Sequence, residues 1–332
     1  MHAKIQAIEY YLPENTLANE ELEALYEGWS AKKIEKKTGI RVRHIAGSDE
    51  TASELGYQAA RKLFTSGIVA PDQIDFLLFC TESPDYPLPP CACVLQDRLN
   101  IPCTAGALDY NLGCSGFVYG LGLAEGMIAS GQAKNVVLIT SETYSKYIHP
   151  LDKSVRTIFG DGASATLLTA SKETQIGPFV YGTDGSGFAN LIVGSGGTHS
   201  EKQKKALELD EKTAFPDNLY MNGPEIFNFT IQAVPAAIEQ LLEKAKIDLG
   251  KIDYFVFHQA NKYMVEHLRQ KIGIDKDKFF IDILETGNTV SSSVPIALKK
   301  AAMNEFIKEG DLVLVIGYGV GYSWATTLIR WT

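Results

Sequence analysis

The sequence predicts an α/β fold made of two similar halves, and two observations carry this prediction. Short apolar runs alternate along the chain with segments of helical periodicity, which is typical of helices packed on a largely parallel sheet. Several of those runs also recur in the same order in the second half of the chain. A length of 332 residues is enough for about two domains and a large buried core.

Individual elements follow from the same patterns. The apolar runs at residues 74–79, 136–140 and 254–257 are rich in β-branched and aromatic residues and predict buried strands. Apolar residues at helical spacing predict helices over residues 53–64 and 226–245.

An internal repeat relates the two halves. Three pairs of strand motifs are separated by 178, 173 and 176 residues. The pairs are IDFLLF at Ile74 with IDYFVF at Ile252, LDYNLG at Leu108 with IDILETGN at Ile281, and NVVLIT at Asn135 with DLVLVI at Asp311. One such match among apolar strands arises easily by chance, but three in register favour a duplication. We therefore expect one unit over residues 1–172 and a second over residues 173–332.

The charge balance argues against two classes of partner. The chain carries 31 basic and 40 acidic residues, a net charge of −9, whereas generic nucleic-acid binders and membrane-surface proteins are usually basic. We therefore expect neither a nucleic-acid nor a membrane partner. The charge-dense segment 201–212 predicts a solvated loop or helix face inserted in the second half.

One apolar segment has the length of a membrane span but not its pattern. Leu312–Ile329 contains 18 residues without a charge, close to the threshold for a transmembrane helix. Glycines interrupt its middle and β-branched residues dominate its ends, so two buried strands around a glycine turn are the better prediction. No basic segment followed by an apolar one stands at the N-terminus, and we expect a cytoplasmic protein.

Among five cysteines, one differs from the rest. The odd count and the absence of a C-x-x-C pair argue against a disulfide framework and a zinc site, so we expect no metal. Four are interpreted as buried thiols. Cys114 instead precedes a nearly uncharged helical segment, where the helix dipole and free N–H groups favour a thiolate. Taken alone, a further buried cysteine is an equally good interpretation.

The repeat brings a histidine and an asparagine into relation with Cys114. His258 closes a strand of the second half, and Asn288 follows a repeated motif at nearly the spacing at which Cys114 follows its counterpart. Singly, a histidine after a strand is more often structural, and an Asn after Gly is usually a turn residue or a helix cap. Together, three reactive side chains at equivalent strand-to-helix junctions predict one shared site.

These motifs resemble the ketoacyl-ACP synthase III group of the thiolase-like condensing enzymes. The resemblance covers the whole chain, and its motifs are YYLPE near the start, TGIR at Thr38 with His44, NLGCSGF around Cys114, FGDGA at Phe159, HQAN at His258, GNT at Gly287 and GVGYSW at Gly319. It implies a Cys–His–Asn triad at Cys114, His258 and Asn288. It also implies the five-layered αβαβα thiolase-like fold and a homodimer.

The resemblance implies a decarboxylative Claisen condensation. Cys114 attacks an acyl thioester and becomes acylated, and backbone N–H groups of Cys114 and Val320, between Gly319 and Gly321, hold the oxyanion. His258 and Asn288 then stabilise the enolate left when a malonyl thioester, malonyl-ACP, loses CO₂. The enolate attacks the acyl group and yields a 3-ketoacyl product, in fatty acid, polyketide or secondary-metabolite synthesis. No metal or cofactor is expected, because coenzyme A or the phosphopantetheine of an acyl carrier protein arrives as substrate.

The expected carrier-binding residues depart from the family pattern. A Trp and an Arg that hold the coenzyme A nucleotide are replaced here by Lys33 and Lys37, and the nearest Trp is Trp29. A second Arg aligns with Lys153, with Arg156 close by. We therefore expect weaker coenzyme A binding and delivery of the acyl group by an acyl carrier protein. Residues 32–43, with six basic residues and one acid, are predicted to contact phosphate or an acidic carrier, against the alternative of a solvated helix face.

Further substrate contacts are expected at Asn261, Gly319 and Gly321. A Phe common at the end of the acyl pocket is replaced by Leu88, which predicts a longer or branched acyl chain unless the Pro-rich loop fills the space. Glu82 aligns near a glutamate that serves as base in related enzymes, although an exposed Glu in a turn is common.

Three alternative functions stay open at this point. They are an acyltransferase without condensation, a non-decarboxylative condensing enzyme and a non-catalytic subunit. Retention of Cys114, His258 and Asn288 argues against the last of these.

Overall fold

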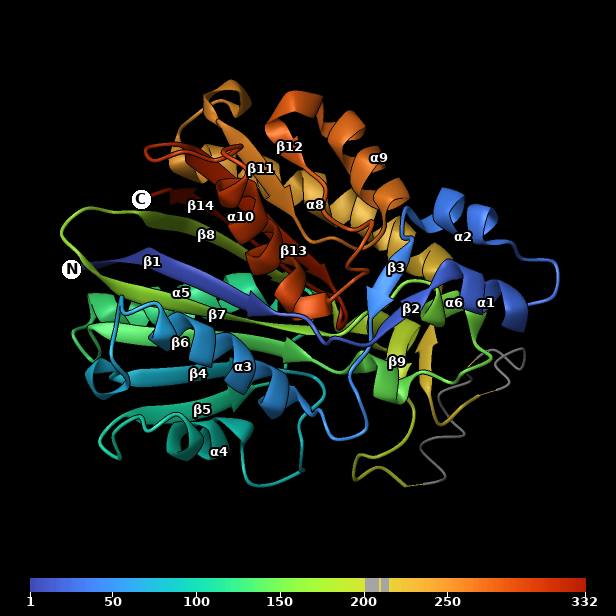
Figure 1. Ribbon diagram of the computed structural model, residues 1–332. Helices are drawn as coiled ribbons and strands as arrows, with labels where there is room; N and C mark the ends of the chain where they lie inside the picture. Colours follow the sequence, from blue (N-terminus) through green and yellow to red (C-terminus); the bar gives the residue numbers. More distant parts are fainter. Residues whose placement is uncertain (201–208, 210–214) are drawn as a thin grey trace.

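Two five-stranded sheets with the same strand order form the centre of the protein, as a computed structural model shows (Figure 1). The structure describes residues 1–200, 209 and 215–332. The strands of the first sheet, in spatial order, are β1 (His2–Tyr11), β7 (Gly162–Ser171), β6 (Asn135–Glu142), β4 (Phe76–Cys80) and β5 (Gly106–Tyr110). Those of the second are β8 (Ile176–Thr183), β14 (Ser323–Arg330), β13 (Leu312–Gly319), β11 (Tyr254–Phe257) and β12 (Phe279–Phe280).

The two sheets also agree in strand direction. In each, the first three strands pair antiparallel and the last three pair parallel. The repeated motifs occupy corresponding strands, β4 with β11 and β6 with β13, so the duplicated architecture predicted from the repeat is confirmed. The expected boundary at residues 172–173 falls between β7 and β8, and we propose it as the limit of the two units.

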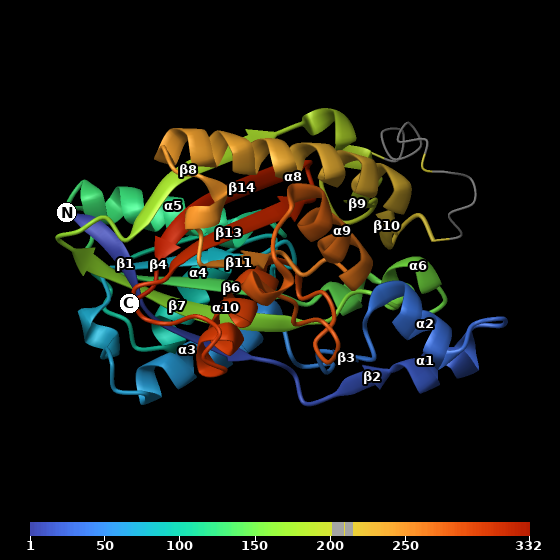
Figure 2. The ribbon, with the colours of Figure 1, turned by 90° about the horizontal axis from the view of Figure 1, so that it is seen from above.

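Helices complete a five-layered αβαβα arrangement (Figure 1 and Figure 2). The helices α5 (Gly116–Ala129) and α10 (Ser293–Met303) lie between the sheets and contact strands of both. The outer face of the first sheet is covered by α3 (Ala52–Thr65) and α4 (Cys91–Arg98). On the outer side of the second sheet lie α8 (Gly223–Ala245) and α9 (Lys262–Ile272). The predicted fold class is therefore confirmed.

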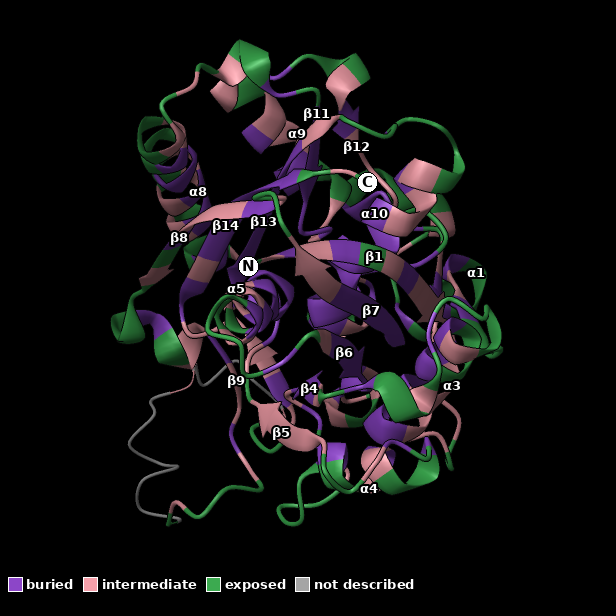
Figure 3. Ribbon diagram, turned by 90° about the vertical axis from the view of Figure 1, so that its left-hand side faces the viewer, coloured by how far each residue is buried: buried purple, intermediate pink, exposed green. Residues whose placement is uncertain are grey.

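Burial on both faces explains why the strands read as continuous apolar runs rather than alternating ones. Seven of the eight residues of β6 and of β13 are buried, and Figure 3 shows β6 and β7 largely in the buried colour. The apolar segment Leu312–Ile329 forms β13 and β14, so the prediction of two strands around a glycine turn is confirmed. Across the described ranges, none of the helices is both long and apolar enough to cross a membrane.

The remaining elements lie at the edge of this core. A short ribbon of β2 (Thr16–Ala18) and β3 (Val42–His44) carries α1 (Asn19–Leu25) and α2 (Ala31–Thr38). A second ribbon pairs β9 (Leu191–Val193) with β10 (Leu219–Met221), near the short helix α6 (Lys153–Arg156). The prediction for the segment 201–212 falls on residues outside the described ones, apart from Leu209.

Candidate active site

Cys114 lies in the turn between β5 and α5, where the C-terminal strand β13 passes over it. The helix α5 begins two residues later, at Gly116. A Cβ on Gly317 would collide with the Cys114 carbonyl, and a Cβ on Gly319 would approach Cys114 Sγ to 2.8 Å. Both glycines are therefore needed for β13 to approach the thiol this closely.

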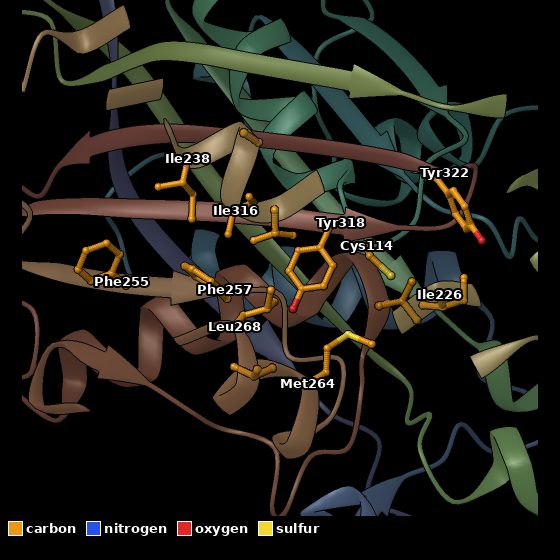
Figure 4. Packing of buried hydrophobic residues seen from close by; sticks show 14 of the residues in the cluster. Cys114, Ile226, Ile238, Phe255, Phe257, Met264, Leu268, Ile316, Tyr318 and Tyr322 are labelled. Carbon is orange, nitrogen blue, oxygen red and sulfur yellow. The ribbon is translucent and has the colours of Figure 1, made fainter. Parts of the chain in front are cut away.

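Opposing influences act on the buried thiol of Cys114. Burial and the nearby carboxyl of Glu82 raise the pKa of the Cys114 thiol, because both disfavour the thiolate. The backbone N–H groups of Val320 and of Cys114 donate toward the sulfur and lower this pKa. Figure 4 shows the thiol close to the ring of Tyr318. Two N–H groups that converge on one point provide the donor geometry of an oxyanion hole.

His258 directly follows β11 and is fully buried. Its Nδ1 lies 2.7 Å from Oγ of Ser293, which also lies 3.0 Å from the Val290 carbonyl oxygen. Burial lowers the pKa of His258 to about 3, so the imidazole is neutral at pH 7. The Ser293 hydroxyl has one proton, which it can donate either to the Val290 carbonyl or to Nδ1; in the tautomer in which Nδ1 accepts it, the ring proton lies on Nε2, which is then a donor.

Asn288 is held by backbone hydrogen bonds on both sides. Its N–H donates to the Ile158 carbonyl and its carbonyl accepts from the Gly160 N–H, each at 3.0 Å. Its side-chain Oδ1 accepts from the Val290 N–H at 2.9 Å. No residue in the described part of the chain accepts a hydrogen bond from Nδ2, so this amide group is available to donate to a substrate.

These three side chains come from corresponding strand ends of the two halves. Cys114 lies between β5 and α5, and Asn288 lies between their counterparts β12 and α10. The ring of Tyr318 packs edge-on against His258, with 5.4 Å between the centroids, and its phenol lies within electrostatic reach of Cys114. The structure therefore brings the predicted triad together in one buried region, where the exposed fraction of each residue is below 5%.

A groove of about 490 Å³ opens beside this region. Three of the predicted substrate-binding residues line it, namely Lys37, Lys153 and Asn261. Asn261 also caps α9, because its Oδ1 accepts from the Met264 N–H at 2.9 Å. Met264 lines the groove and belongs to the same buried cluster as Cys114 (Figure 4).

Trp29 lines this groove although its spacing in the sequence differs from the family pattern. Gly28 adopts a positive φ of 74° and Ser30 caps α2, so the chain turns back and the Trp29 ring packs on that helix. The ammonium groups of Lys33, Lys37 and Lys153 lie 5.3, 4.8 and 5.7 Å from the ring centroid. The Trp29 ring therefore lines the groove with three ammonium groups around it, and the weaker coenzyme A binding inferred from the spacing stays a prediction.

Two other predicted residues lie apart from the groove lining. Arg156 interacts electrostatically with Tyr26 and Arg43, on the side of α6 that faces the N-terminal ribbon. Leu88 is 81% exposed at the tip of the loop between β4 and α4. Leu88 therefore lies outside the buried region around Cys114.

The basic segment 32–43 is less exposed than its composition indicates. Arg43 is fully buried and donates to the Leu17 and Thr157 carbonyl oxygens and to Asn19. Arg41 forms an ion pair with Glu285. The cations left free on this surface are the lysines of α2, so the predicted positive patch is smaller than expected.

The sequence reasoning missed several residues of the site. Ser293 orients His258, and its only signal was the Ser-Ser-Ser run after the GNT motif. Glu142 accepts hydrogen bonds from Ser83 and Ser291, and Tyr144 donates to Glu82. These side chains meet only in the tertiary structure, so no spacing in the sequence relates them.

Comparison with known proteins decides the family. The family model 3-Oxoacyl-[acyl-carrier-protein (ACP)] synthase III matches residues 108–185, and the model of its C-terminal part matches residues 242–331. The beta-ketoacyl-[acyl-carrier-protein] synthase III of Clostridium tetani is 36% identical over 97% of this chain and 96% of its own. The chain belongs to the 3-oxoacyl-[acyl-carrier-protein] synthase III family. It is a condensing enzyme of the acyltransferase class.

Solved structures of synthase III proteins agree with this assignment. A 3-oxoacyl-(acyl-carrier-protein) synthase III is 49% identical, covers all of both chains and superimposes with a TM-score of 0.95. The priming beta-ketosynthase of the R1128 polyketide pathway is 30% identical over 99% of this chain and 96% of its own, with a TM-score of 0.89.

Proposed function

We propose that this synthase III enzyme forms an acyl-enzyme intermediate on Cys114. The sulfur attacks the carbonyl carbon of an acyl thioester, and the N–H groups of Cys114 and Val320 stabilise the oxyanion that forms. Collapse of that intermediate breaks the thioester bond, and the carrier leaves as a thiol that takes up the proton of Cys114. The observation that carries the proposal is the buried thiol at the start of α5, against which Gly319, the residue before Val320, packs closely.

The second half-reaction uses His258 and Asn288 as donors. A malonyl thioester, malonyl-ACP, loses CO₂, and its thioester oxygen gains negative charge as the enolate forms. The Nε2–H of His258 and the Nδ2–H of Asn288 stabilise that oxygen, and the enolate carbon attacks the acyl group on Cys114. The products are a 3-ketoacyl thioester and the free thiol, so the protein needs no metal or cofactor for any step. We place this reaction in cytoplasmic fatty acid or polyketide synthesis.

The test follows both half-reactions in the wild-type protein. Incubation with acetyl-CoA should add one acetyl group, which peptide mass spectrometry should locate on Cys114 rather than on the exposed Cys93 or Cys103. Addition of ¹⁴C-carboxyl-labelled malonyl-ACP should then release labelled CO₂ and a 3-ketoacyl product. Acylation of Cys114 without CO₂ release would favour the alternative of acyl transfer without condensation, and no acylation would disprove the proposal.

The carrier arm is expected to bind in the groove around Trp29. The charged lysines and the indole ring provide contacts for the phosphates and the adenine of coenzyme A, and the same entrance admits the phosphopantetheine of an acyl carrier protein.

We expect Lys153→Ala to raise KM for acetyl-CoA about tenfold, with kcat nearly unchanged, because the contact is lost equally in ground and transition states. Steady-state kinetics measure this, with Lys244→Ala on α8, outside the groove lining, as the matched control. A fall in kcat at constant KM would contradict this assignment.

The edge of the first sheet supports a homodimer. The edge strand β5 has no partner on its outer side among the described strands, and all five of its residues are partly exposed. The neighbouring loop exposes Tyr86 and Leu88. Such an edge is a template for pairing with a second copy. Sedimentation velocity should show a dimer at micromolar concentration, and a monomer there would contradict this proposal.

A further inference from the structure

Glu82 lies on the edge of the first sheet that faces the catalytic region. It follows β4 by two residues, and β4 is the counterpart of β11, which ends directly before His258. A Cβ on Gly113 would collide with the carboxyl of Glu82 and would approach Cγ1 of Val320 to 2.9 Å. The carboxyl therefore packs on the residue before Cys114, beside the residue that supplies an N–H to the thiol.

A rigid network holds Glu82 in this position. Its backbone N–H donates to Oε2 of Glu142 at 3.1 Å, and Glu142 also accepts from the hydroxyls of Ser291 at 2.8 Å and Ser83 at 3.1 Å. The phenol of Tyr144 donates to Oε2 of Glu82. These contacts fix the backbone of Glu82 and one oxygen of its carboxyl, as is typical of a side chain whose position matters for function.

The surroundings of Glu82 disfavour a negative charge on its carboxyl. Burial raises the pKa of Glu82 to about 7, and burial together with Glu82 raises the pKa of Glu142 well above its usual value. A negative charge on Glu82 also opposes the thiolate of Cys114. Part of the residue is exposed, so the carboxyl is open to an interaction with substrate in addition to its contact with Tyr144.

One oxygen of Glu82 remains available for such an interaction. Within the described residues, Oε2 accepts from Tyr144, whereas no side chain or backbone group bonds to Oε1. Glu82 is also partly exposed, unlike its buried neighbours Thr81 and Ser83. An alkyl chain beside Oε1 would strip water from a polar atom without replacing its hydrogen bond, whereas a hydroxyl group would satisfy it.

We propose that Glu82 and Tyr144 select the acyl group transferred to Cys114, and that this group is a short acyl chain with a hydroxyl near the thioester. The inference rests on the proposed function, because it assumes that Cys114 accepts the acyl group. The hydroxyl takes the place of water at Oε1 of Glu82, and the phenol of Tyr144 holds the carboxyl in the orientation that receives it. No bond is made or broken in this recognition.

The test compares two donors that differ by one hydroxyl group. Butyryl and 3-hydroxybutyryl thioesters, each on coenzyme A and on an acyl carrier protein, are offered to the full-length protein, and the rate of Cys114 acylation is followed by mass spectrometry. We expect wild-type protein to be acylated about tenfold faster by the hydroxylated donor, the effect of one hydrogen bond to a polar group that is otherwise left unpaired. Glu82→Leu and Tyr144→Phe should bring the ratio of the two rates toward one.

Matched controls separate recognition from general damage. Tyr147→Phe alters the neighbouring ring, 6.4 Å from that of Tyr144 between centroids, and should leave the ratio unchanged. Thermal melting shows whether Glu82→Leu is folded. If it is not folded, the ratio of the two acylation rates in Tyr144→Phe decides whether the inference holds. Equal acylation of wild-type Cys114 by both donors would overturn the inference while supporting the proposed function. Failure of both donors while acetyl-CoA still acylates Cys114 would overturn the inference alone, and failure of all three donors would overturn the proposed function with it.

Discussion

Replacement of Cys114 by alanine is expected to abolish acylation and condensation. Among the described residues, the sulfur is the only nucleophile placed beside the N–H groups of Val320 and of residue 114, and alanine has no atom that can attack an acyl thioester. Loss of an attacking nucleophile lowers the rate by about 10³-fold or more. Covalent acyl incorporation and 3-ketoacyl formation, measured on the same preparation, should both fall to background.

A second cysteine variant provides the control for Cys114→Ala. Cys91 is also buried, but it lies at the start of α4 near Asp85 and Asp109. Cys91→Ala removes a buried thiol of the same size and should retain acylation. The proposed role of Cys114 would be contradicted by incorporation in Cys114→Ala equal to that in the Cys91 variant.

Those parts of the fold that depend on local pattern could be predicted from the sequence. The strand over residues 254–257 has the predicted bounds, and the helix over 226–245 begins three residues earlier, at Gly223. Burial on both faces makes such strands continuously apolar, so they stand out without an alignment. The internal repeat predicted the shared site, because two halves with the same strand order bring corresponding strand ends together. Cys114, His258 and Asn288 follow such strand ends.

Features that depend on how distant segments pack could not be predicted. Trp29 stands outside the position at which the family pattern has its Trp, which is Lys33 here. The turn at Gly28 and the packing of the ring against α2 bring Trp29 into the groove. Arg43 counts as a surface charge in the sequence, but it is buried by Asn19 and the Thr157 carbonyl. The pairing of Glu82 with Tyr144 joins residues 62 positions apart. In each case the deciding contact is tertiary.

Replacement of Asn288 by alanine is expected to separate the two half-reactions. The Nδ2 donor is positioned by the hydrogen bond from Val290 to Oδ1 and by the two backbone hydrogen bonds of Asn288. It has no partner among the described residues until an enolate oxygen forms. Removing one such donor lowers the rate of the charged step by about 10²–10³-fold, whereas attack by Cys114 uses other donors. In Asn288→Ala, acylation of Cys114 should therefore proceed at nearly the wild-type rate, while the rate of CO₂ release from malonyl-ACP falls.

His258→Ala should behave in the same way, because Nε2 donates to the same oxygen. The double variant should then be little slower than either single variant, since side chains that act as one unit are not additive. The matched control is Asn261→Ala, which removes an amide at the groove rather than beside Cys114 and should raise KM instead. Equal loss of acylation and decarboxylation in Asn288→Ala would show that this residue supports the thiol, and it would remove the basis for two separate donor sets in the site.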